Sequence, residues 1–68
     1  MATAADHERM RHDLMDGAIV AVAQRGMEGL TTRAISAQSK LNEAYIYRYF
    51  LDRDDLLRQA FLRWDARM

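Results

Sequence analysis

The sequence predicts an all-α fold, in which a three-helix helix-turn-helix unit is followed by a fourth helix. The 68-residue chain has no proline and only three glycines, so long helices are permitted. Apolar residues recur at three- and four-residue steps early in the chain, which is the period of one helix face. At three later positions a capping side chain follows a leucine and precedes an aliphatic residue by four positions.

The first helix is predicted over residues 9–25. Its apolar stripe consists of Leu14, Met15, Ala18, Ile19 and Val22. Arg25 in the last turn suits the helix dipole, and Gly26 follows as a residue that takes a positive φ angle at little cost. Residues 1–8 show no apolar period and are predicted to be a flexible lead-in.

Local capping signals predict three more helices, over residues 32–39, 43–50 and 53 to the C-terminus. The caps are Thr31, Asn42 and Asp52. The leucine before each cap is expected to pack on the aliphatic residue four positions after the cap, as a hydrophobic staple. These pairs are Leu30 with Ile35, Leu41 with Ile46, and Leu51 with Leu56. The short joint between the second and third helices is typical of a helix-turn-helix.

Residues 45–50 also fit a β-strand, because tyrosines alternate with other side chains there. Nothing else in the chain could pair with such a strand, and a lone strand leaves its backbone polar groups unsatisfied. A helix is therefore predicted for this segment, with Ile46 and Phe50 on one face.

The composition excludes several classes of function. There is no cysteine, which excludes disulfides, thiolate metal sites and thiol redox chemistry. The chain has no Gly-rich phosphate loop and no His-Glu-x-x-His motif, and His7 and His12 fall on different helix faces, so we expect no enzyme, no cofactor and no metal. It also lacks a signal peptide and an apolar run of roughly 20 residues, so a cytoplasmic protein without membrane contact is expected.

Charge adds a weak signal. Ten cationic residues balance ten acidic ones, but residues 31–53 carry four cations against two acids. This excess is far smaller than that of a strongly basic nucleic-acid-binding domain.

Two segments in fixed register carry a family resemblance. They are Gly-Met-Glu-Gly-Leu-Thr-Thr-Arg at residues 26–33 and Tyr-Ile-Tyr-Arg-Tyr-Phe at residues 45–50, the latter followed by Asp52-Arg53 and Leu56-Leu57. From about residue 14 to residue 57 the chain resembles the DNA-binding domain of the TetR family of transcriptional repressors. The resemblance implies a homeodomain-like unit over residues 9–57 whose third helix enters the major groove. It also implies that residues 58–68 connect to a C-terminal ligand-binding and dimerisation domain absent here, so this is a fragment or a stand-alone domain.

The start of the second helix is a candidate DNA contact. The first turn of a helix favours an anion, and the resemblance implies that Thr31, Thr32 and Arg33 touch phosphates. The guanidinium of Arg33 also fits the guanine edge in the major groove. Alternatively, Thr31 is only a cap and Arg33 only a solvated charge.

The N-terminal residues of the third helix should lie nearest the bases, as in other helix-turn-helix proteins. They are Asn42, Glu43, Ala44 and Tyr45. Asn42 is equally suited to capping, while Ala44 is small enough to touch a thymine methyl group. Glu43 could accept from cytosine, and Tyr45 replaces the small hydroxyl residue usual in the family.

Further candidates follow along the same helix and beyond it. Tyr47 matches the family tyrosine that donates its hydroxyl to a phosphate, and its alternative role is packing. Arg48 and Tyr49 are phosphate candidates or surface and packing residues, and Arg53 stands where the family has a lysine. Lys40 occupies a position at which the family turn usually has glycine. Together with Glu43 and Tyr45, it implies an altered sequence preference or a domain that has drifted from DNA binding.

The fourth helix carries an apolar stripe of Leu57, Ala60, Phe61, Trp64 and Met68. Its first part should close the core, and its last three members should be exposed unless the helix folds back on the first one. The expected partner is double-stranded DNA, bound as a homodimer across two half-sites. A small-molecule effector is expected only if a C-terminal domain exists. The alternative is a protein-interaction module that uses the exposed end of the stripe.

Overall fold

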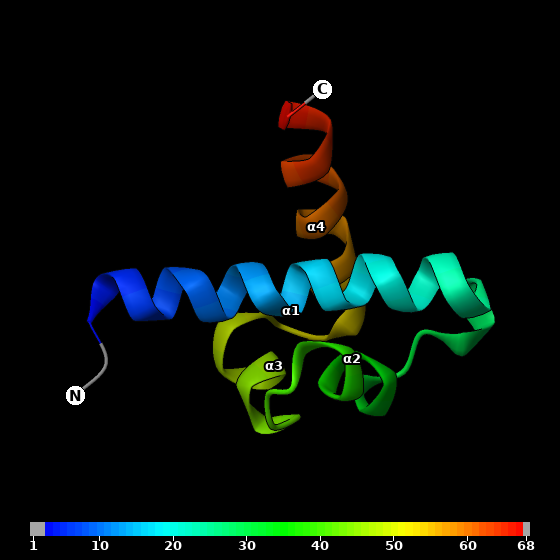
Figure 1. Cartoon of the computed structure of the whole chain (residues 1–68), viewed down its shortest axis with the longest axis horizontal. Helices are drawn as coiled ribbons and strands as arrows, with labels where there is room; N and C mark the ends of the chain where they lie inside the picture. The colour runs from blue at the N-terminus through cyan, green and yellow to red at the C-terminus, as the bar shows by residue number, and fades with distance from the viewer. Residues whose placement is uncertain (1–2, 68) are drawn as a thin grey trace.

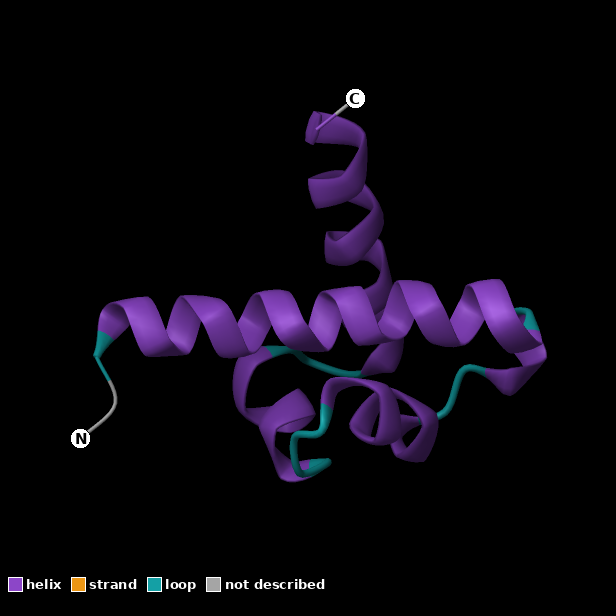
Figure 2. Cartoon of the chain, in the orientation of Figure 1, coloured by secondary structure: helices purple, strands orange, loops and turns teal. Residues whose placement is uncertain are grey.

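A computed structural model describes the backbone of residues 3–67 and the side chains of residues 3–64. Within these residues the chain forms α1 (Ala4–Arg25), the 3-10 turn η1 (Met27–Gly29), α2 (Thr32–Ser39), α3 (Ala44–Tyr49) and α4 (Arg53–Arg67). No strand occurs between residues 3 and 67, as Figure 2 shows, which confirms the predicted all-α class and the helix over Tyr45–Tyr49.

The first helix begins earlier than predicted. We expected residues 1–8 to be a flexible lead-in, but α1 starts at Ala4; residues 1 and 2 lie outside the described part. The side chain of Thr3 accepts the N–H of Asp6 (3.2 Å), and the carboxylate of Asp6 accepts the N–H of Thr3 (3.0 Å). This reciprocal cap satisfies the free N–H groups of the first turn without any apolar period.

The helices enclose one core beneath α1. Figure 1 shows α2 and α3 on one side of α1 and the C-terminal part of α4 on the other. All four helices contribute fully buried side chains, among them Leu14, Ile35, Ile46 and Leu56. Gly17 lies where α1 meets α2, because a Cβ atom there would come within 3.2 Å of the carbonyl oxygen of Ile35. The close contact of these two helices therefore favours a glycine, because a Cβ atom there would be in tight contact with the α2 backbone.

Two of the three predicted caps are confirmed: Thr31 Oγ1 accepts the N–H of Ala34 (3.0 Å), and Asp52 Oδ1 accepts that of Asp55 (2.8 Å). The prediction for Asn42 holds only in part, because its Oδ1 accepts the N–H of Ala44 (2.9 Å) but the N-cap position of α3 is Glu43, whose side chain makes no capping bond. Each bond satisfies a backbone donor that has no partner within its helix.

The staples are confirmed only in part. Leu30 and Ile35 are both buried, and Leu41 packs against the core that contains Ile46. The predicted staple of Leu51 on Leu56 is wrong, because Leu51 is 84% exposed. The apolar contact at this helix entrance comes instead from Phe50, one residue earlier, which is buried.

Two backbone positions have positive φ angles. Gly26 ends α1 with φ 74° and ψ −179°, a region open almost only to glycine, as predicted for this residue. Lys40 ends α2 in the left-handed region, with φ 63° and ψ 21°. A lysine therefore occupies a conformation that favours glycine.

Lys40→Gly is expected to stabilise the domain by about 1 kcal/mol, because relief of left-handed strain exceeds the extra entropy that glycine adds to the unfolded chain. Thermal unfolding followed by circular dichroism should show a rise in Tm. The matched control is Ala37→Gly on the exposed side of α2, which should lower stability by about 1 kcal/mol. A Lys40→Gly variant with an unchanged or lower Tm would contradict the claim that the backbone at Lys40 is strained.

The fourth helix behaves largely as predicted. Leu57 and Ala60 are buried, whereas Phe61 is 39% and Trp64 48% exposed; Met68 lies outside the described residues. The helix also packs across α1, where Arg63 Nη1 lies 3.0 Å from Asp16 Oδ1. The helix therefore packs on α1, as the alternative had it, but this packing does not cover Phe61 and Trp64, which are exposed as first predicted.

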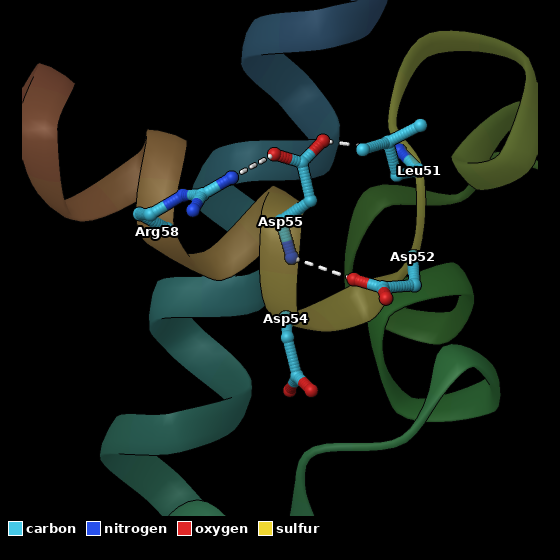
Figure 3. A pocket seen from close by; sticks show the side chains of 5 residues that line it. All are labelled: Leu51, Asp52, Asp54, Asp55 and Arg58. Atoms are coloured by element: carbon cyan, nitrogen blue, oxygen red, sulfur yellow. Dashed lines mark hydrogen bonds and ion pairs between the residues drawn. The ribbon is translucent and has the colours of Figure 1, made fainter.

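The start of α4 is held by Asp55, as Figure 3 shows. Its carboxylate accepts the N–H of Leu51 (3.0 Å) and pairs with Arg58 (2.8 Å). The hydrogen bond from Leu51, followed by those from Arg58 and Gln59, keeps the pKa of Asp55 below its ordinary value of 3.8. The stabilisation is therefore present above pH 3.8 and is lost as the pH falls through the lowered folded pKa.

Asp55→Asn should be less stable than the parent at neutral pH and should lose less stability on acidification. The variant lacks the carboxyl whose pKa is lower in the folded than in the unfolded chain, and this difference makes the stability of the parent depend on pH. Urea unfolding at neutral and at acidic pH measures both effects. Asp13→Asn, on the exposed side of α1, is the matched control and should leave the pH dependence nearly unchanged. Parallel pH profiles for the parent and Asp55→Asn would contradict this role of the carboxylate.

Candidate nucleic-acid interface

The joint between α2 and α3 is held by side-chain hydrogen bonds. The Ser36 hydroxyl donates to the carbonyl oxygen of Leu41, and the N–H of Leu41 donates to Ser39 Oγ (3.3 Å). The N–H of Lys40 closes the end of α2 on the carbonyl oxygen of Ser36 (2.8 Å). These bonds fix the direction in which α3 leaves the turn.

Three residues form an outward surface on α3, which we call the reading face. Ala44, Tyr47 and Arg48 are all exposed and follow i, i+3, i+4 spacing. Tyr47 is 62% exposed, so its alternative role as a packing residue is not supported. The opposite face of the helix is buried through Ile46, and Phe50 follows it into the core.

The other predicted residues at this helix differ in exposure. Asn42, just before the helix, is exposed but its side-chain oxygen accepts the N–H of Ala44, while Glu43 is half-buried. The ring of Tyr45 is half-buried and stacks on that of Tyr49, with ring centres 6.3 Å apart and planes 10° apart. The Tyr45 and Tyr49 rings therefore support α3 from the side rather than extending from it.

Sequence reasoning missed a contact between the start of α1 and the end of α3. His7 Nδ1, in the second turn of α1, lies 2.6 Å from the hydroxyl oxygen of Tyr49. Of the two roles predicted for Tyr49, this bond favours packing over phosphate contact. The Thr3–Asp6 capping signal could have shown that α1 begins at Ala4, although not that His7 meets Tyr49.

The start of α2 gathers two arginines. Arg33 is exposed and lines a shallow hollow together with Arg25 from the end of α1 and Thr31. The hydroxyl of Thr31 is committed to its cap, and Thr32 is half-buried. Two cations therefore lie beside a helix N-terminus, whose partial charge is also positive.

Arg53 is held against the same end of α2. Its Nη1 donates to the carbonyl oxygen of Leu30 (2.7 Å), the residue before the Thr31 cap. Its Nε lies 4.0 Å from Asp54 Oδ1, a weak and exposed ion pair. Arg53 is therefore placed beside the residue that precedes α2, while Asp54 offsets part of its charge.

Within the part of the chain that the structure describes, no three histidine, aspartate or glutamate side chains gather around a point where a metal could bind. None of the helices among the described residues combines the length and the apolar character needed to cross a membrane.

The structure is a helix-turn-helix domain. A tight turn joins the short helix α2 to α3, α3 has an exposed leading edge, and the long helix α1 supports both. A family model described as "Bacterial regulatory proteins, tetR family" matches residues 14–60. The chain belongs to this family, whose matched region is a regulatory DNA-binding domain rather than a catalytic one. No curated protein and no solved structure matched the chain.

Proposed function

We propose that the chain binds double-stranded DNA sequence-specifically and acts as a repressor, with α3 in the major groove. The reading face carries this proposal, because Ala44, Tyr47 and Arg48 project from a helix that is anchored on its other side by buried Ile46. A small residue at the first position lets the helix backbone approach the base edges. Repression follows if occupation of an operator excludes the polymerase, and the site of action is then the cytoplasm.

In this proposal, affinity and specificity come largely from different residues. Tyr47 and Arg53 hold the backbone phosphates, and Arg33 holds a phosphate and can also reach a guanine edge. The residues at the entrance to α3, from Asn42 to Ala44, lie nearest the bases. The chain is neutral overall, so one copy should bind weakly. Two copies on two half-sites would supply the missing affinity. A small-molecule effector enters only through a C-terminal domain outside this chain.

Arg53→Ala should weaken binding to all duplexes alike and reduce the slope of log K against log salt by about 0.9, because one phosphate contact is lost. Fluorescence anisotropy at low and physiological salt measures both quantities. Arg53→Lys, which keeps the charge, should retain most of the slope. Circular dichroism checks that Arg53→Ala still folds after losing the hydrogen bond to the Leu30 carbonyl. A loss confined to one base position would contradict the phosphate role.

The exposed Phe61 and Trp64 favour a second candidate, a protein-interaction module without DNA binding. Selection from a pool of randomised duplexes, followed by anisotropy with the enriched sequence, separates the two. The DNA proposal expects an enriched motif that is bound in a salt-dependent manner. Failure to enrich any motif, combined with salt-independent association of the protein, would favour the interaction module.

A further inference from the structure

The N-terminal part of α1 packs on the end of α3 through a patch of half-buried side chains. His7, Met10 and Arg11 follow i, i+3, i+4 spacing, so they share one side of the helix. All three are half-buried, whereas Glu8 and Arg9 between them are exposed. Figure 1 shows α3 beneath this half of α1. We call His7, Met10 and Arg11 the α1 patch.

The hydroxyl group of Tyr49 lies between two residues of the α1 patch. His7 Nδ1 is 2.6 Å from the hydroxyl oxygen, and the hydroxyl donates to Met10 Sδ at 3.8 Å. A phenol has a single O–H to donate, so the two bonds form together only if His7 Nδ1 is the donor to the phenol oxygen. The two rings also meet edge-on, with ring centres 5.8 Å apart. The Tyr49 hydroxyl therefore both donates and accepts within the domain.

Arg11 extends the same packing to the residue after α3 and to α4. Its guanidinium carbon lies over the buried ring of Phe50, 5.8 Å from the ring centre. Its Nη2 donates to Gln59 Oε1 of α4 (3.3 Å). The α1 patch therefore contacts the last residue of α3, the residue that follows it, and the helix beyond.

These contacts fix how α3 is rotated about its own axis. The anchor of this six-residue helix in the core is Ile46. Tyr45 and Tyr49 lie one residue before it and three residues after it, so they flank it on one side, and their rings stack. A short helix held by one buried side chain can still turn about its axis, whereas a second attachment at its flank prevents the turn. The direction of the reading face therefore depends on the α1 patch.

We infer that the α1 patch positions α3 for base reading, with His7 as the positioning residue. The inference rests on the proposed function and adds a determinant of specificity that acts through Tyr49 rather than through a DNA contact of its own. The family match begins at residue 14, so the whole patch lies outside the matched region. Because phosphate contacts hold any duplex and base contacts select one, a change in the rotation of α3 should affect sequence preference more than general affinity.

Removal of the bond between His7 and Tyr49 tests this role. His7→Phe keeps an aromatic ring but removes the nitrogen, and Tyr49→Phe removes only the hydroxyl. Each should raise the dissociation constant for the duplex enriched from a random pool about three- to tenfold, which corresponds to one hydrogen bond, and leave that for a random duplex nearly unchanged. The double variant should lose no more than either single variant, because both changes remove the same bond. Fluorescence anisotropy measures all of these constants.

A rescue variant and a matched control separate positioning from a general structural defect. His7→Asn should restore the sequence preference, because its amide has a polar atom as many bonds from Cβ as Nδ1. The control is His12→Phe. His12 is also half-buried on α1, but its Nε2 lies 3.0 Å from Glu8 Oε1 on the same helix, so both constants should stay unchanged. A partly unfolded variant would instead lose affinity for both duplexes.

Amide hydrogen exchange of the free chain tests the contact without DNA. His7→Phe should speed exchange in α3 about three- to tenfold and leave α2 unchanged. Unchanged exchange in α3, equally faster exchange in α2, additive losses in the double variant or equal losses for both duplexes would overturn the inference. A parent that binds no duplex would contradict the proposed function instead, and the exchange result would still decide whether the α1 patch holds α3.

Discussion

Ile46→Ala should destabilise the domain severely. Ile46 is a fully buried side chain that holds the six-residue helix α3 in the core. A helix of this length is not stable alone, so it depends on this packing. Removing the side chain should cost about 2–5 kcal/mol. A 68-residue domain has a total stability of only about 3–10 kcal/mol, so the loss takes about half of it.

The measurement is urea unfolding followed by circular dichroism, with Tyr47→Ala as the matched control. Tyr47 is the next residue on the same helix, but it is exposed, so its removal should change stability little. Equal destabilisation by the two variants would contradict the orientation of α3. The pair also separates folding from function, because Tyr47→Ala should stay folded and still bind duplex DNA more weakly.

Arg33→Ala should lower the affinity for the preferred duplex by about 1–3 kcal/mol and relax the preference at one base position, if the guanidinium reads a guanine. The Arg33 side chain is exposed at the start of α2, where it lines a hollow with Arg25, so no buried partner is lost on truncation. Loss of a cation at this point also removes a phosphate contact, so the salt dependence should become weaker.

The matched control is Arg9→Ala, which removes the same charge from the exposed side of α1. Arg9 pairs with Asp6, and this exposed pair contributes little to stability. Anisotropy titrations with the selected duplex and single-base variants of it compare the two proteins. Equal losses of affinity in the two variants would indicate that Arg33 acts only through its charge, and would contradict a direct contact of Arg33 with the DNA.

Local signals in the sequence predicted most of the fold. The side-chain bonds of Thr31, Asn42 and Asp52 act over two or three residues, so they can be identified without knowledge of the tertiary structure. A positive φ angle was predictable at Gly26 for the same reason, because the end of a helix favours that backbone geometry, whereas Lys40 stood out only through the glycine that the family usually has in this turn.

The errors and omissions depend on packing between distant segments. The extension of α1 to Ala4 brings His7 to Tyr49, a contact across 42 positions that no local pattern reports. Leu51 had the right type and spacing for a staple, yet Phe50 occupies the core position beside it. The sequence named the candidate site residues. Which of their side chains project from α3 and which support it depends on how the helix is rotated against the core, and no local pattern reports that rotation.

The most direct test of the central claim is an amide NMR titration of the whole chain with a duplex enriched from a randomised pool. We expect the largest shifts at residues 31–33, 42–48 and 53, with little change around Phe61 and Trp64. Shifts confined to the far end of α4, or no shift at any ratio of duplex to protein, would contradict the claim that α3 presents its leading edge to DNA.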